Sequence, residues 1–302
     1  MTLHDVTLPA ISPHDLRDVE GESHGTPRRT LWRRFRHHRL ALVAAGILLL
    51  LYASAILARV VSPYSPDAID LSSTLAQPSP AHLFGTDYNG RDLLARCLYG
   101  GQISLAVGLV AMLVAMSVGI LVGAVAGFYG GIVDSILMRF VDVMLSIPTF
   151  FLLIIVSTMF QPNALNIMIV IGLFSWTWTA RLVRGEILAL KEREYVEAAR
   201  ALGVGNWRII IRHLLPNVVG TMTVQATLTV GYSILTESAL SYLGLGIQPP
   251  VPSWGNLLNN AQAYLLIAPW LVYPPGLLIA ITVLCFFTIG NTLRDIIDPR
   301  VR

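Results

Sequence analysis

Few residues of this chain could carry out chemistry, and their spacing fits no common catalytic or metal-binding set. The only lysine, Lys191, follows Leu190, so the sequence lacks the Gly-Lys-Ser/Thr segment with which a P-loop binds nucleotide phosphates. Cys97 and Cys285 stand far apart without a CxxC pair, and no HExxH motif occurs. The sequence therefore predicts no catalytic residue, no metal site and no cofactor bound by this chain itself.

A polar series interrupts the apolar stretch 217–240 at every fourth position. Residues four apart share a helix face, so these side chains would form one stripe along a membrane helix. Polar groups in lipid are costly and usually face a protein interior or a water-filled cavity, which makes the stripe a candidate lining of a translocation pathway. Equally, its hydroxyls could bond back to the preceding turn and its acid could reach the outer interface. The stripe is Thr221, Gln225, Thr229, Ser233 and Glu237.

A second series, of small residues, also recurs at every fourth position of one apolar stretch. Small residues at this spacing let two helix backbones approach closely, as in GxxxG packing. We expect a packing face here, within the chain or toward a partner. Its members are Ala111, Ala115, Gly119, Gly123 and Gly127.

The elements that must position these residues follow from composition. The chain has 302 residues, of which 54% are hydrophobic and only 13% charged, and its mean hydropathy is +0.64. A soluble domain carries about 25% charged residues, so the chain is predicted to be an all-α integral membrane protein, and its net charge of +3 does not indicate nucleic-acid binding. A span needs about 20 apolar residues. Six segments qualify, at 40–61, 103–128, 143–160, 164–183, 217–240 and 271–290.

Arginine placement predicts the orientation of these spans. Basic residues gather before the first span, after the fourth and at the C-terminal end, which the positive-inside rule assigns to the cytoplasm. Both termini are therefore expected to be cytoplasmic. The expected organisation is a basic cytoplasmic tail 1–38, a first span 39–62, an external loop 63–102, a core of five spans 103–290 with a cytoplasmic loop 184–216, and a cytoplasmic tail 291–302.

Within the loop 184–216, two short amphipathic helices are predicted. Tyr195, Ala198, Ala199 and Leu202 follow helical spacing, and Gly203 is typical of a residue that ends a helix. A second helix is expected to start with Asn206 as its cap and to present Trp207, Ile210, Ile211 and Leu214, before Pro216 opens the fifth span. Such a hairpin could lie on lipid, but its alanine pair and acid favour docking in the groove of a partner protein.

The segment EAARALGVGNWRIIIRHLLP, at 197–216, resembles the EAA loop of membrane subunits of bacterial ABC importers. Its pattern is EAA, three residues, Gly, nine residues and Ile-x-Leu-Pro. The pattern falls on Glu197, Ala198, Ala199, Gly203, Leu215 and Pro216, with His213 in place of the usual Ile.

Three further segments resemble the C-type permease subunit of dipeptide and oligopeptide importers. They are HLFGTDYNGRDLLAR at 82–96, ESALSYLGLGIQPPVPSWGNLL at 237–258 and GNTLRDIIDPRVR at 290–302. Ala95 stands where the family often has Ser, and Asn291 where it often has Asp. The resemblance covers about residues 30–302.

This resemblance implies the six-helix fold of a type I importer permease in a bacterial inner or plasma membrane. It implies four partners: a homologous second permease subunit, a pair of ATPase subunits that bind ATP and Mg, and an external solute-binding protein. Glu197, Ala198, Ala199 and Gly203 would contact the ATPase or shape the loop, with Arg200 as a further contact. Peptides are the expected substrate, while nickel, glutathione or another small solute remain alternatives. A stand-alone secondary transporter would need ionisable residues at mid-membrane, where only the more peripheral Glu237 comes near.

Overall fold

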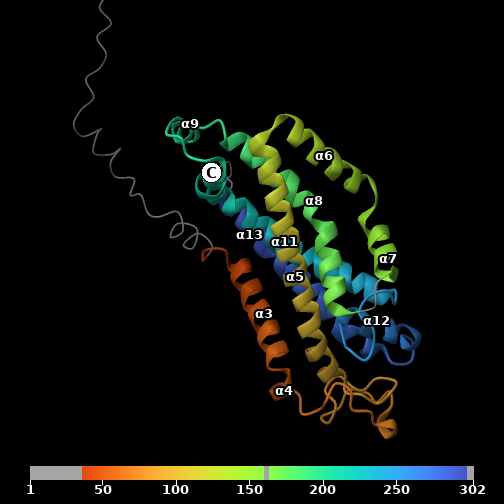
Figure 1. Ribbon diagram of the computed structural model, residues 1–302. Helices are drawn as coiled ribbons and strands as arrows, with labels where there is room; N and C mark the ends of the chain where they lie inside the picture. The colour runs from red at the N-terminus through yellow and green to blue at the C-terminus, as the bar shows by residue number, and fades with distance from the viewer. Residues whose placement is uncertain (1–35, 160–162, 298–302) are drawn as a thin grey trace, which may run out of the picture.

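A computed structural model describes residues 36–159 and 163–297, and within these ranges the chain is helical, without strands. The described part contains five helices that are long and apolar enough to cross a membrane, or six if one bent helix pair is counted as a span. The long helices, shown in Figure 1, are α3 (Arg39–Ile56), α5 (Leu93–Tyr129), α8 (Ala164–Leu190), α11 (Leu215–Tyr242) and α13 (Tyr273–Ile297).

Shorter elements connect the long helices. They are α4 (Ala58–Val61), α6 (Gly131–Ser146), α7 (Thr149–Met159), α9 (Glu194–Ala201), α10 (Asn206–Ile209) and α12 (Trp254–Ala261), with 3₁₀ turns at Leu71–Ser73, Gln262–Tyr264 and Pro269–Leu271 and a π-helical turn at Ile210–Leu214. Almost all of the predicted tail 1–38 and the last residues of the tail 291–302 lie outside the described residues.

Several helices extend beyond the apolar stretches that predicted them. Helix α5 begins at Leu93, so the expected external loop 63–102 ends ten positions early. The reason is a cap: the Asp92 carboxylate accepts a hydrogen bond from the Ala95 N–H at 2.7 Å. Helix α13 continues to Ile297, so the expected tail from 291 starts as helix. Hydropathy marks where a helix meets lipid, whereas caps decide where the helix ends.

The predicted single span 143–160 is wrong in shape, because two helices, α6 and α7, meet there at an angle of 85°. Pro148 lies between them, and the residue before it, Ile147, has the extended backbone that a following proline favours, with φ −98° and ψ 127°. The two aspartates of α6 pair with arginines of α8: Asp134 with Arg184 and Asp142 with Arg181.

Helices α5 and α8 pack at the centre of the bundle along the stripe of small residues. All five stripe residues are buried, and a Cβ on Gly119 would lie 2.8 Å from the Thr179 methyl carbon, while one on Gly127 would lie 2.9 Å from Cβ of Ile187. In the same way, a Cβ on Gly172 of α8 would lie 2.6 Å from Cβ of Val114 on α5. The stripe therefore packs against α8 of the same chain, because only small residues let the two backbones come this close.

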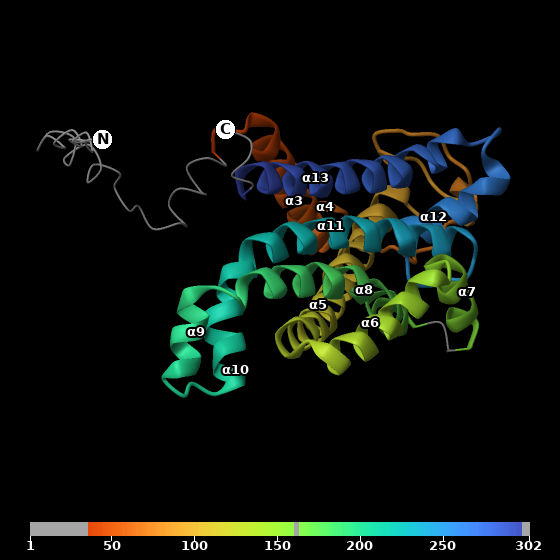
Figure 2. The same ribbon diagram turned by 90° about the horizontal axis from the view of Figure 1, so that it is seen from above.

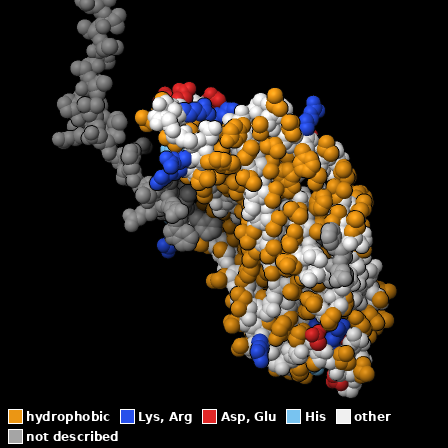
Figure 3. All heavy atoms as spheres, viewed as in Figure 1, with side chains coloured by type: hydrophobic (Ala, Val, Ile, Leu, Met, Phe, Trp, Pro, Cys, Tyr) orange, Lys and Arg blue, Asp and Glu red, His pale blue; other side chains and the backbone are white. Residues whose placement is uncertain are grey.

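The remaining helices pack around this pair and leave an apolar exterior. Helix α3 packs on α13 and α5 through a buried cluster that includes Ala44, Leu105 and Val283. On the visible face, hydrophobic side chains cover the length of the bundle and charged side chains gather toward its ends (Figure 3). Such a surface is stable in hydrocarbon, where water does not penalise exposed apolar side chains.

Candidate functional site: an exposed hairpin and a cavity between α8 and α11

The hairpin formed by α9 and α10 projects from one end of the bundle, away from α12 (Figures 1 and 2). Its first helix ends in a Schellman motif. The Gly203 N–H donates to the Arg200 carbonyl at 2.9 Å, and the Val204 N–H donates to the Ala199 carbonyl at 3.0 Å. Gly203 has φ +74°, a conformation that glycine adopts without strain, which accounts for its place in the motif.

The second helix starts differently from the prediction. Gly205 occupies the capping position, and Asn206 is the first helical residue without a side-chain cap, so the expected Asn206 cap is wrong. After α10 the chain makes a π-helical turn in which the Leu215 N–H donates to the Ile210 carbonyl. Pro216 follows in the first turn of α11 and has no N–H, which favours such a local rearrangement. Nothing in the structure explains the choice of histidine at position 213.

The inner face of the hairpin is anchored in the core of the protein. Val196 and Ala199 of α9, with Ile209 of α10, join a buried cluster that includes Ala124 of α5 and Val183 of α8. The predicted apolar face is therefore only partly the buried one, since Val196 takes the inner place. The hairpin is therefore packed directly against the two central helices.

Several large apolar side chains of the hairpin and of the π-helical turn that follows it are exposed. Leu202 is 83% exposed, Trp207 52% and Ile211 60%, and Tyr195 and Ala198 also face outward. Large apolar side chains clustered at the surface mark interaction sites more often than single exposed ones do.

The exposed surface of the hairpin also carries charged residues, two of which, Glu197 and Arg200, belong to the predicted coupling segment. Glu197 is exposed and forms no ion pair with any described residue. Arg200 is also exposed, but its guanidinium lies 5.4 Å from the centre of the Phe128 ring, a cation–π contact with α5. Glu197 is thus available to a partner protein, whereas Arg200 already has a contact within the chain.

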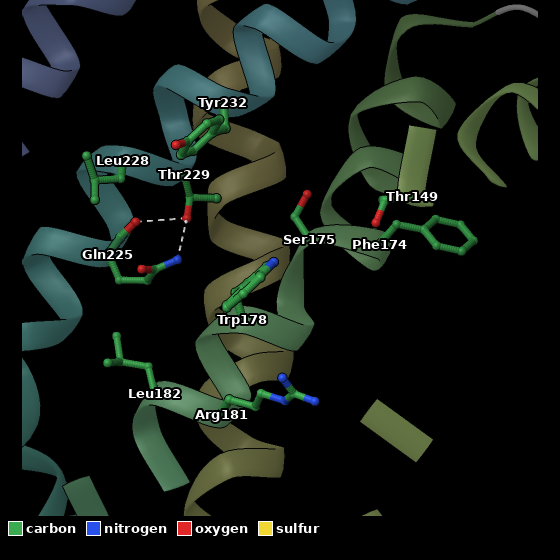
Figure 4. A pocket seen from close by; sticks show the side chains of 10 residues that line it. All are labelled: Thr149, Phe174, Ser175, Trp178, Arg181, Leu182, Gln225, Leu228, Thr229 and Tyr232. Carbon is green, nitrogen blue, oxygen red and sulfur yellow. Dashed lines mark hydrogen bonds between the residues drawn. The ribbon is translucent and has the colours of Figure 1, made fainter. Parts of the chain in front are cut away.

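A cavity of about 780 Å³ lies between α8 and α11, with Thr149 of α7 at its edge (Figure 4). From α11 it receives two residues of the polar stripe, Gln225 and Thr229, whose side chains lie 3.4 Å apart. The Thr229 hydroxyl also donates to the Gln225 carbonyl at 2.8 Å, so this residue lines a cavity and also bonds back to the preceding turn. The full lining is Thr149, Phe174, Ser175, Trp178, Arg181, Leu182, Gln225, Leu228, Thr229 and Tyr232.

A second cavity, of about 520 Å³, adjoins the first and shares Leu182, Gln225 and Leu228 with it. Its lining includes the first residue of the stripe, Thr221, whose hydroxyl donates a hydrogen bond to the Glu186 carboxylate at 3.2 Å. Because they share these residues, the two cavities lie side by side along α11, and together they are called the recess below.

The other two stripe residues, which are nearer the C-terminal end of α11, lie outside both cavities. Ser233 is buried and lines neither cavity, and Glu237, expected near the outer interface, has no exposed surface. The Glu237 carboxylate accepts a hydrogen bond from the Ser241 hydroxyl at 2.6 Å and contacts the Ser104 hydroxyl at 3.4 Å. The segment that includes α12 folds over this region, which explains why position along the helix alone mispredicted the environment of Glu237.

Sequence reasoning missed α12 as a structural element. Its start carries a capping box, in which the Asn256 N–H bonds to the Ser253 hydroxyl and the Ser253 N–H bonds to the Asn256 carbonyl oxygen of the side chain. Its Trp254 is almost fully buried, and the indole donates to the Cys97 carbonyl at 2.9 Å. The Ser-x-x-Asn spacing was the signal that could have predicted this helix.

The segment GTDYNGRD at 85–92 forms a tight turn rather than an open loop. Gly85 and Gly90 have positive φ, and Asp87 pairs with Arg91 at 2.7 Å. Beside the turn, hydrogen bonds from Ser72 and Ser73 lower the pKa of Asp70. The buried charges and glycine conformations make this motif a structural support for the start of α5.

Two families match the sequence. Residues 119–302 match the family described as binding-protein-dependent transport system inner membrane component, more than half of the chain. Residues 26–78 match the N-terminal transmembrane domain of oligopeptide transport permease C.

Relatives of known name align over nearly the whole chain. The oligopeptide transport system permease protein OppC of Escherichia coli K12 is 46% identical over 280 residues, which cover 91% of this chain and 93% of that protein. The glutathione transport system permease protein GsiD of Shigella flexneri is 42% identical over 296 residues, which cover 98% and 95%.

A solved structure shares the fold. A chain of the MetNI methionine ABC transporter, in inward-facing conformations, aligns with a TM-score of 0.50 and 20% identity over 66% of this chain and 95% of that chain. At this identity the likeness shows the fold alone, which is the helical permease fold of a type I ABC importer.

Proposed function

The chain belongs to the family of binding-protein-dependent transport system inner membrane components, and on that premise we propose that it forms half of the pathway of an ATP-driven importer for peptides. The proposed assembly contains a homologous second permease subunit, two ATPase subunits and an external solute-binding protein. ATP and Mg belong to the ATPase subunits, and this chain is non-catalytic.

The peptide substrate is supported by the relatives. One is named for oligopeptides and one for glutathione, which is itself a small peptide with free carboxylates. The similarity to the glutathione permease extends over 98% of the chain, so glutathione is the second candidate substrate.

The observation that carries the proposal is the two-sided construction of the hairpin. Its inner face is packed against α5 and α8, and its outer face presents Leu202, Trp207 and Ile211 to a partner. An ATPase that binds this face and changes conformation would move the central helices with it, because the buried cluster joins the hairpin to both of them. We assign Glu197, Ala198 and Ala199 to this coupling site, Gly203 to its hinge, Leu215 and Pro216 to its exit, and Arg200 to a supporting contact.

The proposed pathway follows the recess beside α11. Thr221, Gln225 and Thr229 lie along it, and a second permease subunit would close its open side. A cytoplasmic location of the hairpin and of both termini is supported by the arginine-rich segments next to them, under the positive-inside rule. The segment with α12 would then face the solute-binding protein.

Reconstitution tests this function directly. The tagged chain is purified in mild detergent with its co-expressed partners and placed in liposomes, and uptake of a labelled tetra-alanine, glutathione and Ni²⁺ is measured with and without ATP. Co-purification of an ATPase subunit and ATP-dependent uptake of tetra-alanine are expected. Uptake driven by an ion gradient without ATP, or purification without an ATPase subunit, would contradict the proposal.

A further inference from the structure

Two ion pairs join the same two helices but differ in their surroundings. Both connect an arginine of α8 with an aspartate of α6: Arg184 with Asp134, and Arg181 with Asp142. The arginines are three positions apart and so lie on neighbouring turns of one helix face. The chain thus contains a matched pair of interactions, one of which serves as a control for the other.

The Arg184 pair has the geometry of a structural link. Both aspartate oxygens accept hydrogen bonds from the guanidinium, one of them at 2.6 Å, and the side chains are only 34% and 16% exposed. Arg184 is not among the residues that line the cavity. A two-point contact of this kind orients the guanidinium firmly.

The Arg181 pair is more exposed and has fewer contacts. A single contact joins the guanidinium to Asp142, and the side chains are 43% and 53% exposed. Arg181 lines the 780 Å³ cavity and is the one charged side chain among the ten described residues around it. Because a single contact holds Arg181 to Asp142 and the guanidinium lines the cavity, another anion in the cavity can take the place of Asp142.

Two hydroxyls of the cavity already donate hydrogen bonds within the chain. The Ser175 hydroxyl donates to the Ile171 carbonyl at 2.7 Å, and the Thr229 hydroxyl donates to the Gln225 carbonyl. Trp178 and Tyr232 supply broad apolar surfaces (Figure 4). The cavity therefore suits side chains of varied kind and offers one strong, directed interaction, with an anion at Arg181.

We infer that Arg181 binds a carboxylate of the passing substrate, in exchange for Asp142, and that this contact favours substrates with a free carboxylate. The inference rests on the proposed function and deepens it, since it identifies the chemical group that the pathway itself recognises. A guanidinium offers five N–H donors in a plane that fits a carboxylate, and a contact open to water remains weak enough to release its ligand.

The test compares two peptides in the reconstituted complex: labelled tetra-alanine with a free C-terminal carboxylate and the same peptide as its C-terminal amide. Initial ATP-driven uptake of each is measured at a saturating concentration of loaded binding protein. The variants are Arg181→Gln and the matched Arg184→Gln.

Arg181→Gln should slow uptake of the free acid by about tenfold while leaving uptake of the amide near its wild-type rate, as expected for one lost charge-assisted hydrogen bond. Arg184→Gln should affect both peptides by the same factor. An equal loss for both peptides in Arg181→Gln, or no loss for either, would overturn the inference.

Asp142→Asn provides an independent measurement if Arg181→Gln does not assemble. It leaves Arg181 free of its carboxylate partner and should raise the ratio of acid to amide uptake severalfold. An unchanged ratio would contradict the exchange of anions at Arg181. If the wild-type complex imports neither peptide with ATP, the proposed function itself fails, which is a different result from an altered ratio.

Discussion

The carboxylate of Glu237 on α11 lies 3.4 Å from the hydroxyl of Ser104 on α5, although 133 positions separate them in the sequence. The Ser104 hydroxyl also accepts a hydrogen bond, at 3.1 Å, from the backbone N–H of Trp254 at the start of α12. With the 2.6 Å bond from Ser241 of the same helix, this network of hydrogen bonds joins α11, α5 and α12 around a fully buried Glu237. A buried polar group with its hydrogen bonds made specifies one arrangement of its neighbours, and its loss leaves those neighbours unpaired.

Glu237→Ala should therefore destabilise the protein by about 1–3 kcal/mol, the cost of leaving buried hydroxyls without an acceptor. Glu237→Gln retains an acceptor oxygen and should cost less. Thermal unfolding in detergent measures both, with Thr236→Ala, whose exposed hydroxyl bonds only to its own helix, as the control. Equal melting temperatures for Glu237→Ala and the wild type would contradict the structural role of this network.

Gly123→Leu should prevent correct packing of α5 on α8. A Cβ at this position would meet the carbonyl oxygen of Ala180 and lie 2.9 Å from Cβ of Val183, both fixed parts of α8. Overpacking of this kind costs about 1–3 kcal/mol or more. The matched control is Gly46→Leu in α3, where nothing lies within 4 Å. Size-exclusion profiles in detergent should show loss of the folded peak for Gly123→Leu alone.

Glu197→Lys should uncouple transport from ATP hydrolysis while insertion and folding stay normal. Glu197 is exposed on the hairpin without an ion-pair partner among the described residues, so reversing its charge disturbs a partner rather than the fold. We expect peptide uptake to fall by more than about tenfold, since misplaced charge at an interface costs several kcal/mol. Glu192→Lys, exposed just before α9, controls for added charge. Wild-type uptake by Glu197→Lys would show that the ATPase docks elsewhere.

Thr229→Cys should react with a small water-soluble thiol reagent in at least one transport state, because Thr229 lines the cavity beside α11. Ser233→Cys, one turn further along the same helix, should stay unreactive because Ser233, unlike Thr229, lines neither cavity. The native residues Cys97 and Cys285 are buried and should give little background. Labelling followed by mass spectrometry, with and without ATP, reads out both. Inertness of Thr229→Cys in every state would contradict an aqueous pathway at this position.

Features that depend on neighbours in the sequence were predictable. Apolar length identified the membrane helices, and Gly203 identified the end of α9, because hydropathy and a left-handed backbone are properties of a short segment. Spacing also identified two stripes on two helices. Pro148 could have predicted the bend between α6 and α7, because a proline disfavours helical backbone at the preceding residue, Ile147. Hydropathy alone favoured one straight span.

Features that depend on contacts between distant segments required the tertiary structure. It decided that the small stripe faces α8, that Val196 rather than Tyr195 anchors the hairpin, and that Glu237 is enclosed. It also decided that the residues of the polar stripe have different surroundings. Thr221, Gln225 and Thr229 line the cavities between α8 and α11, whereas Ser233 and Glu237 are buried outside these cavities. The sequence by itself determined what kind of helix each segment forms and which residues share its face. Only packing decided what that face meets, because a periodicity of four describes one helix and carries no information about its neighbour.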